Sequence, residues 1–131
     1  MGQLVVSVEQ IGPATSRGTA RSHSVIIDRP VEKGGTDQGP LGGEYLLLAL
    51  AGCFMSNLLA AARTREIAVA GLTIQAVGTL SASPERLTAA TLTLSGHPDK
   101  EELRKLATIA ERSCIVTNTL NQSLPIRVDI E

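Results

Sequence analysis

The sequence predicts an α+β fold, in which antiparallel sheets accompany a long central apolar helix and a second helix. The long helix is predicted by residues 45–62, which are almost all apolar or small. Residues 72–82 and 87–95 alternate apolar and polar side chains across a short turn, as the strands of an antiparallel hairpin do. Residues 99–114 repeat apolar side chains at helical spacing. Strands, a helix, a hairpin, a helix and a final strand follow in an order typical of the α+β class.

Length and composition indicate one domain over residues 1–131 with an aliphatic core. Aromatic residues make up 2% of the chain, represented by Tyr45 and Phe54, so Leu, Val, Ile and Ala must fill the interior. The formal charge is −1 with acids and bases interspersed, which argues against a nucleic-acid or membrane partner. The first ten residues lack the charged start and long apolar run of a signal peptide, so we expect a cytoplasmic protein.

The N-terminal region predicts a two-stranded hairpin followed by a flexible loop. Residues 3–9 are rich in valine and alternate like a strand, and residues 22–28 form the second candidate strand. Between them, residues 14–20 read as a turn, which places Arg17 beside a glycine. Residues 31–43 hold five glycines and one proline, so we expect an irregular loop that delivers the chain to the long helix.

The long helix predicts the assembly of the protein. A helix that is apolar on nearly all sides must be buried on nearly all sides. The polar break at Ser56 and Asn57 leaves it short of the roughly 18 to 20 uninterrupted apolar residues of a bilayer span, so we interpret it as the core helix of a soluble domain. A lone chain with so few aromatic residues has little bulk to cover such a helix, and we therefore expect a homodimer.

The C-terminal half predicts a hairpin, a helix and a closing strand. Leu80 is expected on the inner face of the first hairpin strand. Asp99 is the expected N-cap of the second helix, whose buried stripe includes Leu106, and Cys114 falls at its far end. In the tail, residues 124–131, the apolar side chains alternate with charged ones, which predicts a strand with Ile126, Val128 and Ile130 inward.

The two cysteines are the candidate functional residues. Cys53 lies in the middle of the apolar helix and Cys114 about sixty residues later, so no C-x-x-C redox motif or zinc spacing is present. Taken alone, each can be a small buried hydrophobe. A reactive thiol needs a nearby cation or helix N-terminus to stabilise its thiolate. Arg17 and Arg21, in the N-terminal segment, are the candidates for that cation.

The run GGTDQGPLGGEYLLLALAGCF, together with a second cysteine near the end of a later helix, resembles the OsmC/Ohr family of osmotically inducible and organic hydroperoxide resistance proteins, and its OsmC-like branch in particular. The resemblance implies an intertwined homodimer with the long helices at its centre. It also implies thiol-dependent reduction of organic hydroperoxides, with Cys53 as the peroxidatic and Cys114 as the resolving cysteine of one disulfide. The expected reductant is a dithiol of the lipoyl or thioredoxin type, and no metal or organic cofactor is expected.

The resemblance is weaker at the family's other two catalytic positions. In the family, an arginine activates the thiol, and a glutamate ten residues before the reactive cysteine holds that arginine. This chain has Gly43 at the position of the glutamate. Glu44 stands one place nearer, a shift that rotates a helical side chain by about 100°. Arg17 is the first choice for the arginine and Arg21 the second, although both also fit as solvated charges. Glu44 has an alternative interpretation as an anion favoured at a helix start.

One alternative function and one rejected metal site complete the sequence interpretation, whereas a dimer that serves only as an assembly module has no positive feature in the sequence. The first is a non-enzymatic OsmC-like protein that binds a small apolar molecule at the dimer interface, with cysteines that only pack; the missing glutamate at position 43 favours it. The second is a zinc site formed by His23, His97 and the cysteines. We reject it because no pair has ligand spacing and His97 heads a helix, where a surface histidine is common.

Overall fold

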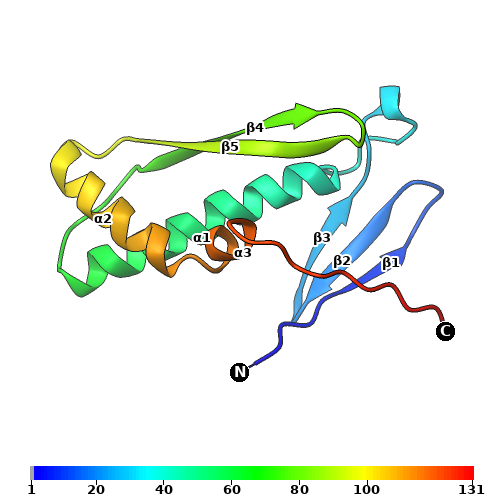
Figure 1. Ribbon diagram of the computed structural model, residues 1–131, viewed down its shortest axis with the longest axis horizontal. Helices are drawn as coiled ribbons and strands as arrows, with labels where there is room; N and C mark the ends of the chain where they lie inside the picture. Colours follow the sequence, from blue (N-terminus) through cyan, green and yellow to red (C-terminus); the bar gives the residue numbers. More distant parts are fainter. Residues whose placement is uncertain (1) are drawn as a thin grey trace. The chain divides into compact units, whose positions relative to one another are not determined.

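The computed structural model describes residues 2–131, which divide into two compact units (Figure 1). The first unit ends at Leu46 and the second extends from Leu47 to Glu131. Both contain antiparallel strands, and helices follow the strands along the chain, which agrees with the predicted α+β class. The expectation of a single domain over residues 1–131 stays a prediction.

The first unit holds a three-stranded antiparallel sheet in the order β1 (Ser7–Gln10), β2 (Ser16–Ala20) and β3 (His23–Ile27). The sequence prediction of a turn at residues 14–20 is therefore wrong, because β2 is the central strand. Its polar residues and Gly18 resemble a turn, but Gly18 is buried, and a β-carbon there would lie 3.2 Å from the side chains of Val25 and Ile27. The neighbouring strands thus supply the apolar cover that β2 itself lacks.

The glycine-rich loop after β3 is ordered around the carboxylate of Asp28. This side chain is buried and accepts hydrogen bonds from the hydroxyls of Thr36, at 2.7 Å, and Thr15, at 3.0 Å. It also accepts from three backbone amides, those of Arg29, Thr36 and Gln38. The Thr36 hydroxyl and these other donors outweigh the opposing effect of burial and hold the pKa of Asp28 far below its ordinary value. The loop contains one short 3-10 helix, η1 (Val31–Lys33), where the sequence predicts only irregular backbone.

The end of this loop packs on β3 and fixes the start of the long helix. The Asp28 amide donates to the carbonyl of Pro40, and a β-carbon on Gly39 would lie 2.3 Å from the carbonyl oxygen of Ile26. The same carbonyl accepts a 2.7 Å hydrogen bond from the Tyr45 hydroxyl. Only glycine permits the close approach at position 39.

The long helix, α1 (Gly42–Thr64), forms where the sequence predicts it. One face is buried and carries Leu50, Phe54, Leu58, Ala61 and Ala62. Another is not: Leu48 is 57% exposed, and Leu46 and Leu59 are exposed too. The single chain thus leaves part of α1 uncovered, and burial of the remaining face by a partner chain stays a prediction. By length and composition α1 would also suffice to cross a membrane, but a single helix of this kind is weak evidence, because the core helices of soluble proteins pass the same test.

In the second unit, β4 (Thr73–Ser81) and β5 (Arg86–Ser95) form the predicted antiparallel hairpin, which runs alongside α1 (Figure 1). Ile74 and its register partner Leu94 pack against the core. A bulge at Thr79 and Leu80 shifts the register, and Leu80 is exposed. The prediction of Leu80 on the inner face is wrong because the pairing is irregular there. Thr79 pairs with Ala89 and Leu80 with Leu87, so the extra residue, Thr88, lies on β5, and the regular alternation of β4 ends at Leu80.

Two helices complete the second unit. In α2 (Lys100–Ser113), the carboxylate of Asp99 accepts from the Glu102 amide at 3.1 Å, which confirms the predicted N-cap, and Leu106 is buried as predicted. A third helix, α3 (Ile115–Leu120), is absent from the sequence prediction because its β-branched residues favour strands. Cys114 lies between these two helices, as the C-cap of α2 and the N-cap of α3.

The predicted closing strand is wrong in the described chain. Residues 124–131 form no strand there, and the side chains expected to face inward, Ile126, Val128 and Ile130, are exposed. A strand requires a neighbour that accepts its ladder of hydrogen bonds, and the described chain provides none for this segment. The N-terminal prediction is partly wrong for the same reason, since β1 begins only at Ser7 and Leu4 is exposed.

Candidate active site

The structure brings the two cysteines together in the second unit. Cys53 lies in the middle of α1, half-buried against the core cluster. Cys114, at the corner between α2 and α3, belongs to that cluster and is 0% exposed. Cys53 thus packs against the same core cluster that contains Cys114, and its side chain is one of the groups that lower the pKa of Cys114. Both cysteines are free, so this is a dithiol pair with one member open to solvent and one enclosed.

The sulfur of Cys114 accepts a hydrogen bond at the start of α3. The backbone amide of Thr117 donates to it at 3.4 Å, in the manner of a helix N-cap. Burial raises the pKa of Cys114, but the hydroxyl and amide of Thr117, the Cys53 thiol and the Val116 amide outweigh it, so the pKa lies below the ordinary thiol value. The Thr117 hydroxyl oxygen is buried and, within the described residues, makes no well-formed hydrogen bond.

Sequence reasoning missed Asn57, which is the polar neighbour of Cys53. Its side-chain nitrogen lies 2.9 Å from the carbonyl oxygen of Cys53 and 3.6 Å from the sulfur. The available signal is its spacing, because a residue four positions after Cys53 on a helix lies on the same face. A polar side chain at that position of an otherwise apolar helix can serve the thiol.

The two candidate arginines lie in the first unit. Arg17 stands on β2 opposite Glu9 of β1, and its guanidinium forms an exposed ion pair with that carboxylate at 3.2 Å. Arg21 lies in the turn between β2 and β3, exposed, with a φ of +56°. The catalytic roles of both arginines stay predictions.

Glu44 lies in the first turn of α1, where its carboxylate accepts a 3.0 Å hydrogen bond from the backbone amide of Leu41. This arrangement satisfies an amide at the helix start and fits the alternative interpretation of Glu44 as an anion favoured there. Within the first unit, Arg17 forms its ion pair with the carboxylate of Glu9 and not with that of Glu44. The proposed catalytic role of Glu44 stays a prediction.

His97 and His23 are the other members of the rejected zinc site. The side chain of His97 is only 6% exposed, and its Nε2 lies 2.8 Å from the carboxylate of Glu102. The expectation of a surface histidine at this helix start is therefore wrong, since the imidazole is itself enclosed and contacts a carboxylate. His23 is exposed on β3. Over residues 2–131, no three His, Cys, Asp or Glu side chains gather in a way that could hold a metal ion.

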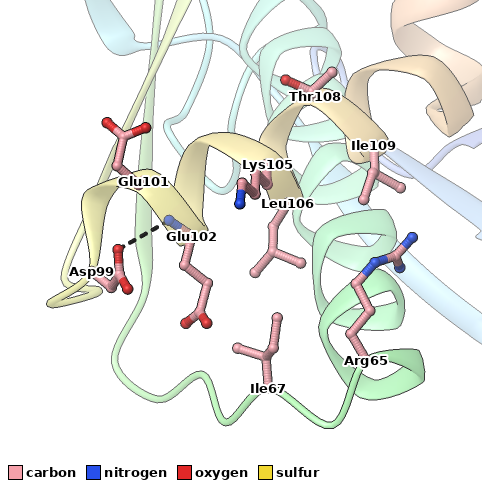
Figure 2. A pocket seen from close by; sticks show the side chains of 9 residues that line it. All are labelled: Arg65, Ile67, Asp99, Glu101, Glu102, Lys105, Leu106, Thr108 and Ile109. Atoms are coloured by element: carbon pink, nitrogen blue, oxygen red, sulfur yellow. Dashed lines mark hydrogen bonds between the residues drawn. The ribbon is translucent and has the colours of Figure 1, made fainter.

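A cavity of about 620 Å³ lies between the end of α1 and the first turns of α2 (Figure 2). Ile67, Leu106 and Ile109 supply its apolar part. Charged and polar side chains complete the lining, namely Arg65, Asp99, Glu101, Glu102, Lys105 and Thr108. None of the predicted site residues lines it, so this cavity is separate from the cysteine pair.

Comparisons with known proteins identify the fold and the family. Among solved structures, an OsmC-like protein from Mycoplasma pneumoniae is 19% identical, with a TM-score of 0.78 over 92% of this chain and 88% of that chain. An organic hydroperoxide resistance protein OsmC from Legionella pneumophila is 18% identical, with a TM-score of 0.64 over 92% and 90%. An organic hydroperoxide resistance protein from Elizabethkingia anophelis is 17% identical, with a TM-score of 0.66 over 90% and 87%.

At such identities these structures establish a shared α+β fold, as the sequence predicts, and not a shared activity. No curated protein is similar enough in sequence to match. The sequence profile of the OsmC-like proteins, however, matches residues 35–129, which is well over half of the chain and includes both cysteines. The chain therefore belongs to the OsmC-like protein family.

Proposed function

We propose that the protein is a cytoplasmic, homodimeric thiol peroxidase that reduces organic hydroperoxides through Cys53 and Cys114. The observation that carries the proposal is the packing of two free thiols from distant parts of the chain into one core cluster, one thiol half-buried and one buried. Such an arrangement suits a cysteine that meets a substrate and a cysteine that resolves its oxidised form. Two structures of similar fold are called organic hydroperoxide resistance proteins, which supports this substrate class.

The reaction begins at Cys53 because it is the more accessible sulfur. Its thiolate attacks the distal peroxide oxygen, the O–O bond breaks, and the alkoxide takes a proton and leaves as an alcohol. Cys53 is then a sulfenic acid. The Cys114 sulfur attacks the Cys53 sulfur, hydroxide leaves and is protonated to water, and an intrachain disulfide remains. A dithiol of the lipoyl or thioredoxin type reduces this disulfide by exchange and is itself oxidised to a disulfide.

An arginine near Cys53 would stabilise charge developing on the peroxide oxygens. Arg17 is the first candidate and Arg21 the second. The Arg17–Glu9 pair is exposed, and pairs of that kind contribute at most about 1 kcal/mol, so it does not prevent Arg17 from serving another partner. Replacing the correct arginine by alanine should slow alkylation of Cys53, and replacing Glu44 should do the same only if Glu44 orients that arginine.

The homodimer is proposed from the exposed apolar surface of the single chain. On α1, Leu48 and Leu59 are exposed, and so are the apolar side chains of the C-terminal tail and of residues 4–6. Apolar side chains left exposed in such numbers are typical of a chain that associates with a partner. An apolar lining donated by these helices would favour alkyl and fatty acid hydroperoxides over hydrogen peroxide.

A second candidate is a non-enzymatic protein that binds a small apolar molecule at the dimer interface. The contacts of Glu44 with the Leu41 amide and of Arg17 with Glu9 favour it, because neither residue stands in the expected arginine–glutamate pair. In this case the two cysteines would serve packing alone.

One experiment separates the two candidates. The fully reduced protein is treated with one equivalent of cumene hydroperoxide, and free thiols and disulfide-linked peptides are measured. The peroxidase should lose both thiols within seconds, yield cumyl alcohol, and regain the thiols with dihydrolipoamide or reduced thioredoxin. Hydrogen peroxide should react more slowly. Retention of both thiols would support the binding protein, and over-oxidised Cys53 beside a free Cys114 would exclude the resolving role.

A further inference from the structure

The cavity between the end of α1 and the first turns of α2 has an apolar floor and a charged rim (Figure 2). Ile67, Leu106 and Ile109 supply the floor, and Leu106 is only 1% exposed, so the floor belongs to the core of the second unit. The volume of about 620 Å³ falls within the range of about 300 to 1,000 Å³ that is typical of small-molecule sites. The cavity is therefore large enough for a small organic molecule with an apolar body.

The acidic side chains of the rim already have partners within the protein. The carboxylate of Asp99 accepts the Glu102 amide at 3.1 Å, and the carboxylate of Glu102 lies 2.8 Å from Nε2 of His97. Glu101 forms an ion pair with Arg104, three residues later on α2. The acidic groups of the rim thus have little need of a cation from a ligand.

The basic side chains of the rim are less fully engaged. Among residues 2–131, neither Arg65 nor Lys105 forms an ion pair. One guanidinium nitrogen of Arg65 donates to the carbonyl of Ala61 at 3.0 Å, which holds this side chain at the end of α1. A guanidinium has five N–H donors, so most of them remain available to a ligand. Figure 2 shows Arg65 on the opposite side of Ile67 from Asp99, so the rim has a basic side and an acidic side.

We propose that this cavity is a binding site for a small aliphatic carboxylate. The hydrocarbon chain of the ligand covers the apolar floor, and its carboxylate faces Arg65 and Lys105, which bind it through charge-assisted hydrogen bonds. The acidic side of the rim repels the carboxylate and thereby fixes the orientation of the ligand. The site goes beyond the proposed peroxidase, because none of the residues given a catalytic role lines the cavity.

Binding is tested by titrating the reduced protein with octanoate and following its amide signals by two-dimensional NMR. The signals of Ile67, Leu106 and Ile109 should shift to saturation, and that of Cys53 should not. Octylamine, with the opposite charge, and 1-octanol, with none, should bind at least about tenfold more weakly than octanoate.

Three results of this titration would overturn the proposal. Octanol that binds as well as octanoate would show adsorption to exposed apolar surface, and octylamine that binds more tightly would show that the acidic side of the rim prevails. The third is the absence of any saturable shift up to the solubility limit of octanoate.

Substitutions test which charges hold the carboxylate. Arg65→Gln keeps a donor for the Ala61 carbonyl but loses the charge, and combined with Lys105→Gln it should weaken octanoate binding at least about tenfold. The matched control combines Arg63→Gln, at the end of α1, with Lys100→Gln, at the start of α2. These two residues do not line the cavity, so the control should bind octanoate like wild type. Equal weakening in both double variants would reduce the effect to net charge and overturn the site. No peroxide is used, so a failure of the proposed peroxidase activity is recognised separately.

Discussion

The side-chain amide of Asn57 lies one helical turn after Cys53 and points its nitrogen at both the carbonyl oxygen and the sulfur of that residue, at 2.9 and 3.6 Å. Sulfur hydrogen bonds are long, and the 3.6 Å contact places a donor where charge would develop on Cys53 as it reacts. Asn57, which belongs to the polar break in α1, thereby supplies a hydrogen-bond donor to Cys53.

Replacing Asn57 by alanine should therefore slow alkylation of Cys53 at neutral pH by about fivefold, which corresponds to a net hydrogen bond of about 1 kcal/mol. Asn57→Asp should slow it further, because a carboxylate repels the thiolate. The exposed neighbour Ser56, changed to alanine, provides the control and should react like wild type. An alkylation rate in Asn57→Ala equal to that of Ser56→Ala would show that the contact is only structural.

Asp28 should make the fold sensitive to acid. Its pKa is lower in the folded chain than in the unfolded chain, so Asp28 stabilises the fold above the ordinary aspartate pKa of about 3.9 and loses that contribution as the pH falls below it. Asp28→Asn should lower the urea midpoint at pH 7, and its difference from wild type should shrink toward pH 3.

The matched control is Asp37→Asn, in the same loop. Asp37 is exposed and has a φ of +55°, a conformation that asparagine tolerates equally well. Its urea midpoint should follow wild type at every pH. A deficit of Asp28→Asn that stays constant from pH 7 to pH 3 would contradict the proposed role of the ionised carboxylate.

The two faces of α1 should respond differently to charge. Leu48 is exposed in the single chain, so Leu48→Glu should give a folded protein that sediments as a monomer at micromolar concentration, while wild type sediments as a dimer. Leu50 is only 7% exposed, and Leu50→Glu should abolish soluble expression because it buries an unpaired charge. A well-folded wild-type monomer in the ultracentrifuge would exclude the dimer.

The N-cap of α2 should contribute measurably to stability. Asp99→Ala removes the acceptor of the Glu102 amide and should cost about 1 kcal/mol in the free energy of unfolding, measured by urea titration. Asp129→Ala, in the exposed tail, breaks only a surface ion pair with Arg127 and should cost far less. Equal losses in the two variants would mean that the cap is not formed in solution.

Regular patterns made the helices and the hairpin predictable from sequence. The apolar run of α1, the alternation in β4 and β5, and the aspartate before α2 each depend on local spacing, and all three were found. The predictions failed where a segment depends on a neighbour distant in sequence. The polar strand β2 is covered by β3, and the tail near Ile130 has the alternation of a strand without a partner.

The candidate site could likewise be predicted only in part from the sequence. The two cysteines could be chosen from sequence because cysteine is rare in the chain and Cys53 lies in the middle of an apolar helix. The hydrogen-bond donor to Cys114 could not be predicted in the same way. Thr117 lies on α3, whose β-branched residues do not predict a helix, and its contact with Cys114 depends on the corner between α2 and α3. For Glu44, the sequence allowed both a catalytic role and a role at the helix start, and spacing alone could not decide between them; the structure shows a contact at the helix start.

The hydrogen bond from the Tyr45 hydroxyl to the Ile26 carbonyl has a practical consequence for optical work on the protein. The chain has one tyrosine and no tryptophan, so its intrinsic fluorescence arises from a single ring whose hydroxyl is tied to β3. Emission should therefore report on the opening of the first unit, whereas the thiols, both in the second unit, report on the other part of the chain. A denaturation followed by tyrosine emission and by thiol labelling in one cuvette would show whether the two units unfold together.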